Sequence, residues 1–169
     1  TAALRRDAAN VAALQGMSIL SAQLGRFEHA LKCADRALSL TPASPALHFH
    51  RGELQCALHR PEQALESYRA SLAIDERLAQ ADPRSAIWQN DLAVSQARIG
   101  DVLLAQCNLP AALAAFQAFL AVIERLAVTD PTAFLLNVVD PEAAVLQAAD
   151  AAMRQVVANE AVDALLTVD

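Results

Sequence analysis

The sequence has few of the residues on which most turn-rich folds depend. It contains four glycines and seven prolines, and aromatic residues make up only 4% of it. This scarcity excludes an all-β fold with many tight turns. Hydrophobic residues nevertheless make up 55% of the chain, so alanine and leucine must supply most of the apolar surface. Because alanine has the highest helix propensity and lets helix backbones approach closely, the composition favours packed helices.

Positive charge is also scarce. Lys32 is the only lysine, the net charge at pH 7 is −6, and no run of basic residues is present. A phosphate-binding surface needs clustered positive charge, so we do not expect nucleic acid as a partner. The three cysteines, Cys33, Cys56 and Cys107, are an odd number without close pairing. That pattern favours a reducing compartment, and we expect a cytoplasmic protein.

Segments for targeting and for crossing a membrane are not expected either. No stretch resembles a signal peptide. The most apolar stretch, residues 111–123, contains Gln117 and runs directly into Glu124 and Arg125. It is too short for a membrane span and predicts a buried helix instead. Because the chain does not begin with methionine and stops abruptly, we expect a fragment of a longer protein.

What the sequence does contain is an internal repeat. ALESYRASLAIDERLAQADP, from Ala64, returns as ALAAFQAFLAVIERLAVTDP from Ala112, an offset of 48 residues. A second offset, of 34 residues, relates Leu31 to Leu65 and Leu38 to Leu72. The longer offset adds about two helical turns to each of the two helices of a unit. Because whole turns are added, the apolar face of each helix keeps its direction. We expect helices at about 10–24, 27–40, 44–59, 61–81, 84–107 and 109–129, stacked as antiparallel hairpins in a solenoid.

The repeats resemble tetratricopeptide repeats. In LGRFEHALKCADRALSLTP the signature positions are held by Gly25, Phe27, Ala30, Ala37 and Pro42; the next unit matches at Gly52, Ala64 and Tyr68, and the third at Gly100, Ala112 and Phe116. The resemblance covers about residues 8–130, in units at about 10–42, 44–81 and 84–129. The lengthened units look like the extended repeats of many bacterial multi-domain proteins. The resemblance implies an all-α fold, a short right-handed solenoid of helix hairpins.

In that family the small residue of the first helix and the alanine of the second lie where the two helices cross. The bulky residue four positions further on fills the gap. The first unit departs from this pattern, because Ser18 replaces the glycine and Ala34 replaces the aromatic residue. In the third unit Phe119 replaces a small residue.

The repeats are predicted to end near residue 131, because Pro141 would fall inside a fourth copy of the helix. We therefore expect a repeat domain at 1–130 and a helical cap at 131–169, with a helix starting at Asp140 and a short one at about 160–167. Residues from about 128 onward also resemble part of the SPFH domain of stomatin- and prohibitin-like proteins. The strands that precede this part in that family are missing, and Ala158 and Asn159 replace an expected glycine. We therefore expect neither the SPFH fold nor membrane association.

Two arrangements of histidine and cysteine are conceivable but not expected to act. His29, Cys33, Cys56 and His59 could form a Cys2His2 zinc site if their helices pack antiparallel. Their spacing matches no known zinc finger, and buried cysteine usually serves as a small apolar residue. A His29–Cys33 catalytic dyad lacks an orienting third group and an oxyanion site. We expect no metal, no cofactor and no enzymatic activity.

The resemblance implies a protein-interaction scaffold that binds a peptide or a partner helix in its concave groove. The first helix of each hairpin lines that groove, which places eight residues in it: Gln15, Ile19, Phe49, Glu53, Cys56, Ala97, Asp101 and Leu104. Gln15 and Ile19 stand where the subgroup that grips chaperone C-termini needs a lysine and an asparagine, so we reject that ligand.

Glu53 and Asp101 hold equivalent groove positions, with Phe49 nearby, and predict a basic-plus-apolar peptide as the partner. The alternative function is self-assembly into a homo-oligomer. In it, helices 109–129 and 141–157 pair between chains and the repeats act as a spacer.

Overall fold

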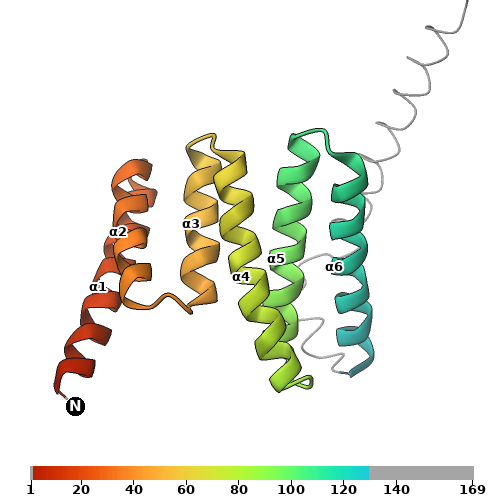
Figure 1. Ribbon diagram of the computed structural model, residues 1–169, viewed down its shortest axis with the longest axis horizontal. Helices are drawn as coiled ribbons and strands as arrows, with labels where there is room; N and C mark the ends of the chain where they lie inside the picture. The colour runs from red at the N-terminus through yellow and green to blue at the C-terminus, as the bar shows by residue number, and fades with distance from the viewer. Residues whose placement is uncertain (1, 130–169) are drawn as a thin grey trace, which may run out of the picture.

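The computed structural model describes the backbone of residues 2–129 and the side chains of residues 10–127. This part of the chain forms six α-helices and no strand: α1 (Ala2–Gln23), α2 (Phe27–Leu40), α3 (Pro45–Ala57), α4 (Pro61–Ala81), α5 (Ala86–Ala105) and α6 (Leu109–Thr129). Figure 1 shows them as a row of antiparallel hairpins in chain order. The all-α expectation is confirmed. The cap at 131–169 lies outside the described residues.

The predicted helix limits agree with the observed ones to within about two residues, except at the start of α1. That helix begins at Ala2, not near residue 10. The prediction was wrong because the segment before residue 10 is rich in alanine and contains neither glycine nor proline, so nothing in it stops a helix. At α3 the local signals act as expected: Pro45 opens the helix, and the Leu47 amide donates to the Ser44 hydroxyl at 3.4 Å.

The turn inside each hairpin has the same geometry in all three units, which are α1–α2, α3–α4 and α5–α6. Gly25, His59 and Cys107 hold the left-handed position, with φ of 71°, 56° and 58°. The next residue's amide donates back across the turn in each case: Arg26 N to Ser21 O at 2.8 Å, Arg60 N to Gln55 O at 2.9 Å and Asn108 N to Leu103 O at 2.9 Å. This is the Schellman pattern that ends a helix. The three units are therefore structural repeats.

The helices of each hairpin cross at the positions that the repeat pattern predicts. A Cβ atom on Gly52 would lie 2.6 Å from the Tyr68 ring, and one on Gly100 would lie 2.6 Å from the Phe116 ring. No side chain larger than hydrogen fits at either position without displacing the ring. In unit one Ser18 takes this position, and its hydroxyl donates to the Ala30 carbonyl at 2.8 Å.

Successive units pack through leucine and valine side chains. Leu31 of α2 belongs to one buried cluster with Leu54 of α3, and Leu65 of α4 belongs to another with Val102 of α5. The two turns added to units two and three have a core of their own: Ala79, Leu92, Ala93, Val122 and Ile123. Lengthening by whole turns therefore extends the core without shifting it.

Among the described residues, the last helix is buried on one face only, whereas its sequence predicts a buried helix. α6 packs Ala112, Val122 and Leu126 inward, but Leu113 on its outer face is 52% exposed. No element among residues 2–129 covers that face. Residues 109–127 are also long and apolar enough, by length and composition alone, to cross a membrane.

Candidate functional site

The eight predicted groove residues lie on the first helices of the three hairpins. Gln15 and Ile19 belong to α1, three others to α3 and the remaining three to α5. None of the eight is buried, and Ile19 is 42% exposed. The register taken from the repeats therefore places all of them on accessible helix surface.

A cavity of about 250 Å³ opens between α3 and α5. Its lining is Glu53, Cys56, Tyr68, Arg98, Asp101 and Val102. It brings together three of the predicted residues, Glu53, Cys56 and Asp101, whereas the other five do not line it. Residues of two successive units contribute to its walls, so the cavity depends on how the units stack.

Sequence reasoning missed three residues of this cavity: Tyr68, Arg98 and Val102. Arg98 stands one turn before Asp101 on α5, so its face could have been recognised from helical spacing. Tyr68 was recognised only as the residue that fills the helix crossing. Its ring does so, but its hydroxyl continues to within 3.8 Å of the Cys56 sulfur.

Each groove carboxylate already has a cationic or potentially cationic partner within the chain. Arg98 Nη1 lies 3.6 Å from Asp101 Oδ2, and His50 Nδ1 lies 3.6 Å from Glu53 Oε2. The repeat alignment did not reveal these partners, although His50 and Arg98 each stand three residues before their carboxylate and so share its helix face. Burial raises the pKa of Asp101 above its usual range, although Arg98 opposes the shift.

Tyr68 forms the floor of the cavity as a neutral group. It is 2% exposed, and burial, followed by the neighbouring Cys56 thiol, raises the pKa of its hydroxyl well above the usual range. Phe49 packs on it with ring centroids 5.3 Å apart and planes tilted by 58°. Phe49 is therefore partly buried and held in place by Tyr68, next to the cavity but outside its lining.

Ser18, His50 and Glu53 form a chain of polar contacts that resembles a catalytic triad. Ser18 Oγ lies 3.0 Å from His50 Nε2, and His50 Nδ1 faces Glu53. Ser18 is fully buried, and its hydroxyl hydrogen is committed to the Ala30 carbonyl. His50 Nε2 therefore carries the hydrogen that Ser18 accepts. A serine with no exposed surface and no free hydrogen cannot attack a substrate. These three polar contacts are therefore structural.

The cysteine and histidine residues considered for zinc do not assemble. Cys33 Sγ lies 3.8 Å from His29 Nδ1, which also contacts the Ser21 hydroxyl at 2.9 Å. Cys56 instead lies against Tyr68. Within residues 2–129 no three histidine, cysteine or acidic side chains gather in a way that could hold a metal ion.

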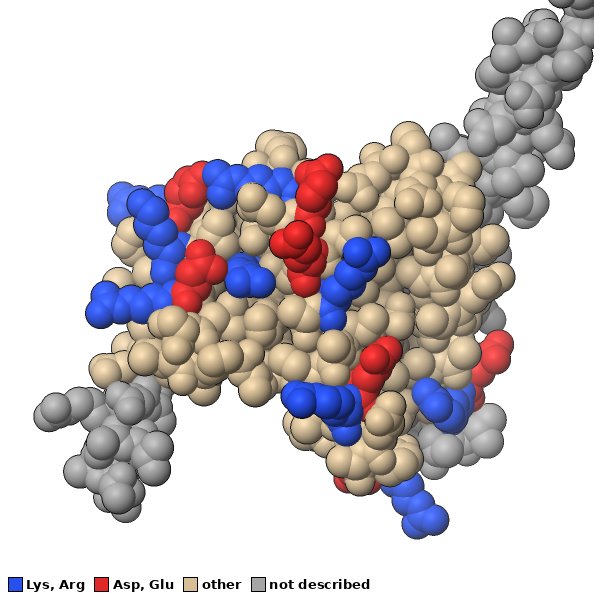
Figure 2. Space-filling view, in the orientation of Figure 1, with Lys and Arg blue, Asp and Glu red and all other residues tan. Residues whose placement is uncertain are grey.

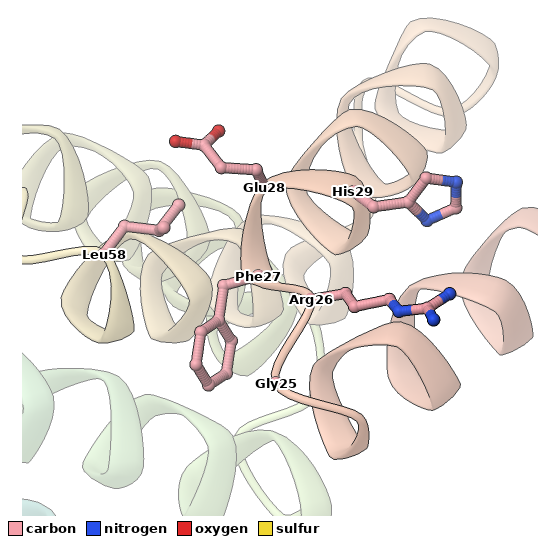
Figure 3. Close-up of a pocket in the computed structure, with 6 residues that line it drawn as sticks. All are labelled: Gly25, Arg26, Phe27, Glu28, His29 and Leu58. Carbon is pink, nitrogen blue, oxygen red and sulfur yellow. The ribbon is translucent and has the colours of Figure 1, made fainter.

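A larger cavity, of about 380 Å³, lies at the turn end of units one and two. Figure 3 shows its lining, which comes from the α1–α2 turn, the start of α2 and the end of α3: Gly25, Arg26, Phe27, Glu28, His29 and Leu58. Glu28 pairs with Arg60 beside it. The exposed surface of this cavity is mainly apolar, and none of the predicted groove residues lines it. We therefore do not assign the binding site to this cavity.

A buried carboxylate lies outside both cavities. Asp75 of α4 is 1% exposed, and its Oδ2 accepts from Ser95 of α5 at 3.1 Å and from Ser71 at 3.3 Å. Its Oδ1 has no hydrogen-bond partner among the described residues. Burial raises the pKa of Asp75 to about 6. Sequence reasoning did not predict this cluster, because Glu76 and Arg77 follow Asp75 directly and a run of charged residues is typical of a solvated helix face.

Comparison with known proteins supports the fold. The crystal structure of the Sgt2 TPR domain from Aspergillus fumigatus matches with a TM-score of 0.58 and 16% identity, over 89% of this chain and 82% of that one. No family model and no curated protein matches the sequence. At that identity the likeness concerns the fold alone. The chain thus has the all-α helical-repeat fold of a tetratricopeptide-repeat solenoid, whereas nothing in the comparisons supports the SPFH resemblance.

Proposed function

We propose that this protein is a non-enzymatic scaffold that binds a peptide or a partner helix along α1, α3 and α5. The observation that carries the proposal is the cavity between α3 and α5. It is open to solvent, it is built by two successive units, and its lining combines charged side chains with an apolar wall. Small clefts of this kind accept single side chains of a bound segment. The TPR-like fold, which typically presents such a face, supports the same conclusion.

The partner that fits this surface is a segment with basic and apolar side chains. The cavity holds two carboxylates against one guanidinium, so it retains an excess of negative charge. An incoming lysine or arginine would compete with Arg98 for Asp101, since the two groups are 3.6 Å apart and half exposed. Ile19 and Phe49 offer apolar contacts on the neighbouring helices. Charge-assisted hydrogen bonds would then add to apolar burial.

The test uses random peptides displayed against the full chain. Enrichment of sequences combining arginine or lysine with leucine, isoleucine or phenylalanine is expected, with affinities of about micromolar strength. The selected peptides are then titrated against Glu53→Gln, Asp101→Asn and Phe49→Ala, each of which should weaken binding about fivefold.

The matched control is Glu66→Gln, which removes an exposed carboxylate from α4 and should leave binding unchanged. Peptides that bind all three groove variants as tightly as the wild type, at low and moderate salt, would contradict the proposed site.

Self-assembly is a second candidate function, and the exposed outer face of α6 favours it. The other helix of that hypothesis, at 141–157, lies outside the described residues.

A reducing, cytoplasmic location also remains our proposal, in keeping with three free cysteines of which Cys56 and Cys107 are exposed.

A further inference from the structure

The first and last helices of the described repeats expose positions that are buried in the helices between them. Under the repeat offsets of 34 and 48 residues, Leu31, Leu65 and Leu113 hold the same position on α2, α4 and α6. Leu31 is 8% exposed and Leu65 is 9% exposed, but Leu113 is 52% exposed. Among the described residues, Leu113 is thus the one member of this set that is exposed.

The covered members of the set show what Leu113 is shaped to contact. Leu31 packs in one cluster with Leu54 of α3, and Leu65 packs in one cluster with Val102 of α5. Leu54 and Val102 are themselves equivalent, and they are only 2% and 6% exposed. The residue at this position on α1 is Leu20, which is 61% exposed.

Leu20 is the centre of an apolar stripe on α1. Met17 and Leu20 are three residues apart and share one face of α1, and Leu24 follows directly after the helix, in the turn. They are 48%, 61% and 71% exposed. On α3 the equivalents of Leu20 and Leu24 are Leu54 and Leu58, which pack in the cluster shared with α2. The face of α1 therefore has the form of a surface that receives the second helix of a preceding unit.

We propose that a second copy of this chain supplies that helix, so that α6 of one copy packs on α1 of the next. Leu113 would then contact Leu20 as Leu65 contacts Val102. The contact continues the stacking already present between units, and it uses neither the groove nor the cavity between α3 and α5. It is therefore independent of the peptide-binding proposal.

Charge neither selects nor opposes the pairing of α6 with α1. The helix α1 carries Arg5, Arg6 and Asp7, and α6 carries Glu124 and Arg125, so neither of the two helices that would meet has a large net charge. Figure 2 shows basic and acidic side chains together at the α1–α2 end of the visible face, and an uncharged upper surface over α6. What favours a second copy is that one chain exposes both halves of the contact that its units make internally, Leu113 on α6 and Leu20 on α1.

Contact between two different surfaces does not close on itself. Each added copy presents a fresh α6 at one end and a fresh α1 at the other. The expected product is an open series of stacked chains whose mean length grows with concentration.

The experiment is sedimentation velocity on the full chain, from about 5 to about 500 μM, a range that brackets micromolar association. The mean mass should rise more than twofold across the range, with no plateau at a dimer. Leu20→Glu and Leu113→Glu each place a charge in one end and should remain monomeric throughout. An equal mixture of the two variants should form dimers and nothing larger, because one intact α6 meets one intact α1. Ile87→Glu, which changes a residue that is 67% exposed on α5, should associate as the wild type does.

Several results would overturn the proposal. A wild type that stays monomeric across the range would do so, as would variant mixtures that fail to dimerise. A monomer in which Leu113→Glu lowers the melting temperature would show that the chain's own residues cover α6. A wild-type monomer that binds phosphatidylcholine vesicles in a flotation assay, together with a Leu113→Glu variant that does not, would assign that face to a membrane.

Discussion

Unit one and unit three solve the same packing problem with different pairs of residues. In unit three Gly100 leaves room for the Phe116 ring, and a Cβ atom there would meet that ring at 2.6 Å. In unit one the ring is absent because position 34 is alanine, and the crossing accepts Ser18, which is fully buried. The larger residue at position 18 and the smaller residue at position 34 therefore compensate each other. At a helix crossing, the combined volume of the two facing side chains is limited, and not the volume of either one alone.

The largest effect should come from filling the crossing of unit three. Gly100→Leu is expected to lower the free energy of unfolding by about 2–3 kcal/mol, because four heavy atoms must displace the Phe116 ring from a packed core. Urea denaturation at 25 °C measures the change. Gly16 of α1 is the matched control, since a Cβ atom there has nothing within 4 Å. Gly16→Ala should stabilise the fold by about 0.5–1 kcal/mol through helix propensity. Equal effects at the two glycines would contradict the crossing.

The next effect tests whether the two residues are coupled. Gly100→Ser and Phe116→Ala should each destabilise unit three, but together they rebuild the Ser18–Ala34 pair of unit one. A double-mutant cycle should therefore give a favourable coupling free energy of about 1–2 kcal/mol. Additive losses would mean that the departures in unit one are unrelated accidents.

The comparison of units also explains how far the sequence predicts the structure. Repeat offsets predict the helices, the crossing positions and the helix that carries each groove residue, because all of these follow from one period. The offsets cannot predict what one unit has and the others lack. Arg98 of unit three reaches Asp101, whereas its equivalent in unit two, His50, bridges Ser18 and Glu53. The groove carboxylates are therefore paired differently in units two and three, which the repeat period alone does not predict.

The same limit applies to the start of α1 and to the outer face of α6. Both lie at the margins of the described repeats, so no described unit packs against them. At α1 the local helix propensity of alanine decides the outcome, and at α6 an apolar face has no cover among residues 2–129. An apolar composition predicts burial only where something is present to pack against.

The helical turns added in units two and three allow a second comparison, with an expected effect of about 1 kcal/mol on the free energy of unfolding. Asp75 of unit two corresponds to Ile123 of unit three, which is 6% exposed. Burial raises the pKa of Asp75 to about 6, above about 3.9 in the unfolded chain. The cost of the buried charge is therefore absent below pH 4, grows between pH 4 and 6, and is complete above that. Lowering the pH from 7 to 5 should recover about 1 kcal/mol of unfolding free energy. Asp75→Asn serves as the reference, because histidines also titrate in this window. The stability of the wild type relative to Asp75→Asn should rise by that amount as the pH falls. A constant difference would contradict the raised pKa.

The smallest effect concerns the three hairpin turns. They share one backbone conformation but have different residue types at the left-handed position. His59 and Cys107 adopt φ of 56° and 58°, where Gly25 adopts 71°. A side chain in this left-handed region carries a steric cost that glycine avoids, although glycine also loses more entropy on folding. Since the first term is the larger at a helix C-terminus, His59→Gly and Cys107→Gly should each stabilise the fold by about 0.5 kcal/mol. Gly25→Ala should destabilise it by about 1 kcal/mol. Melting temperatures measured side by side resolve such shifts. Because the His59 and Cys107 side chains are exposed, lost packing cannot hide the gain, and a destabilised His59→Gly would mean that this turn is not left-handed in solution.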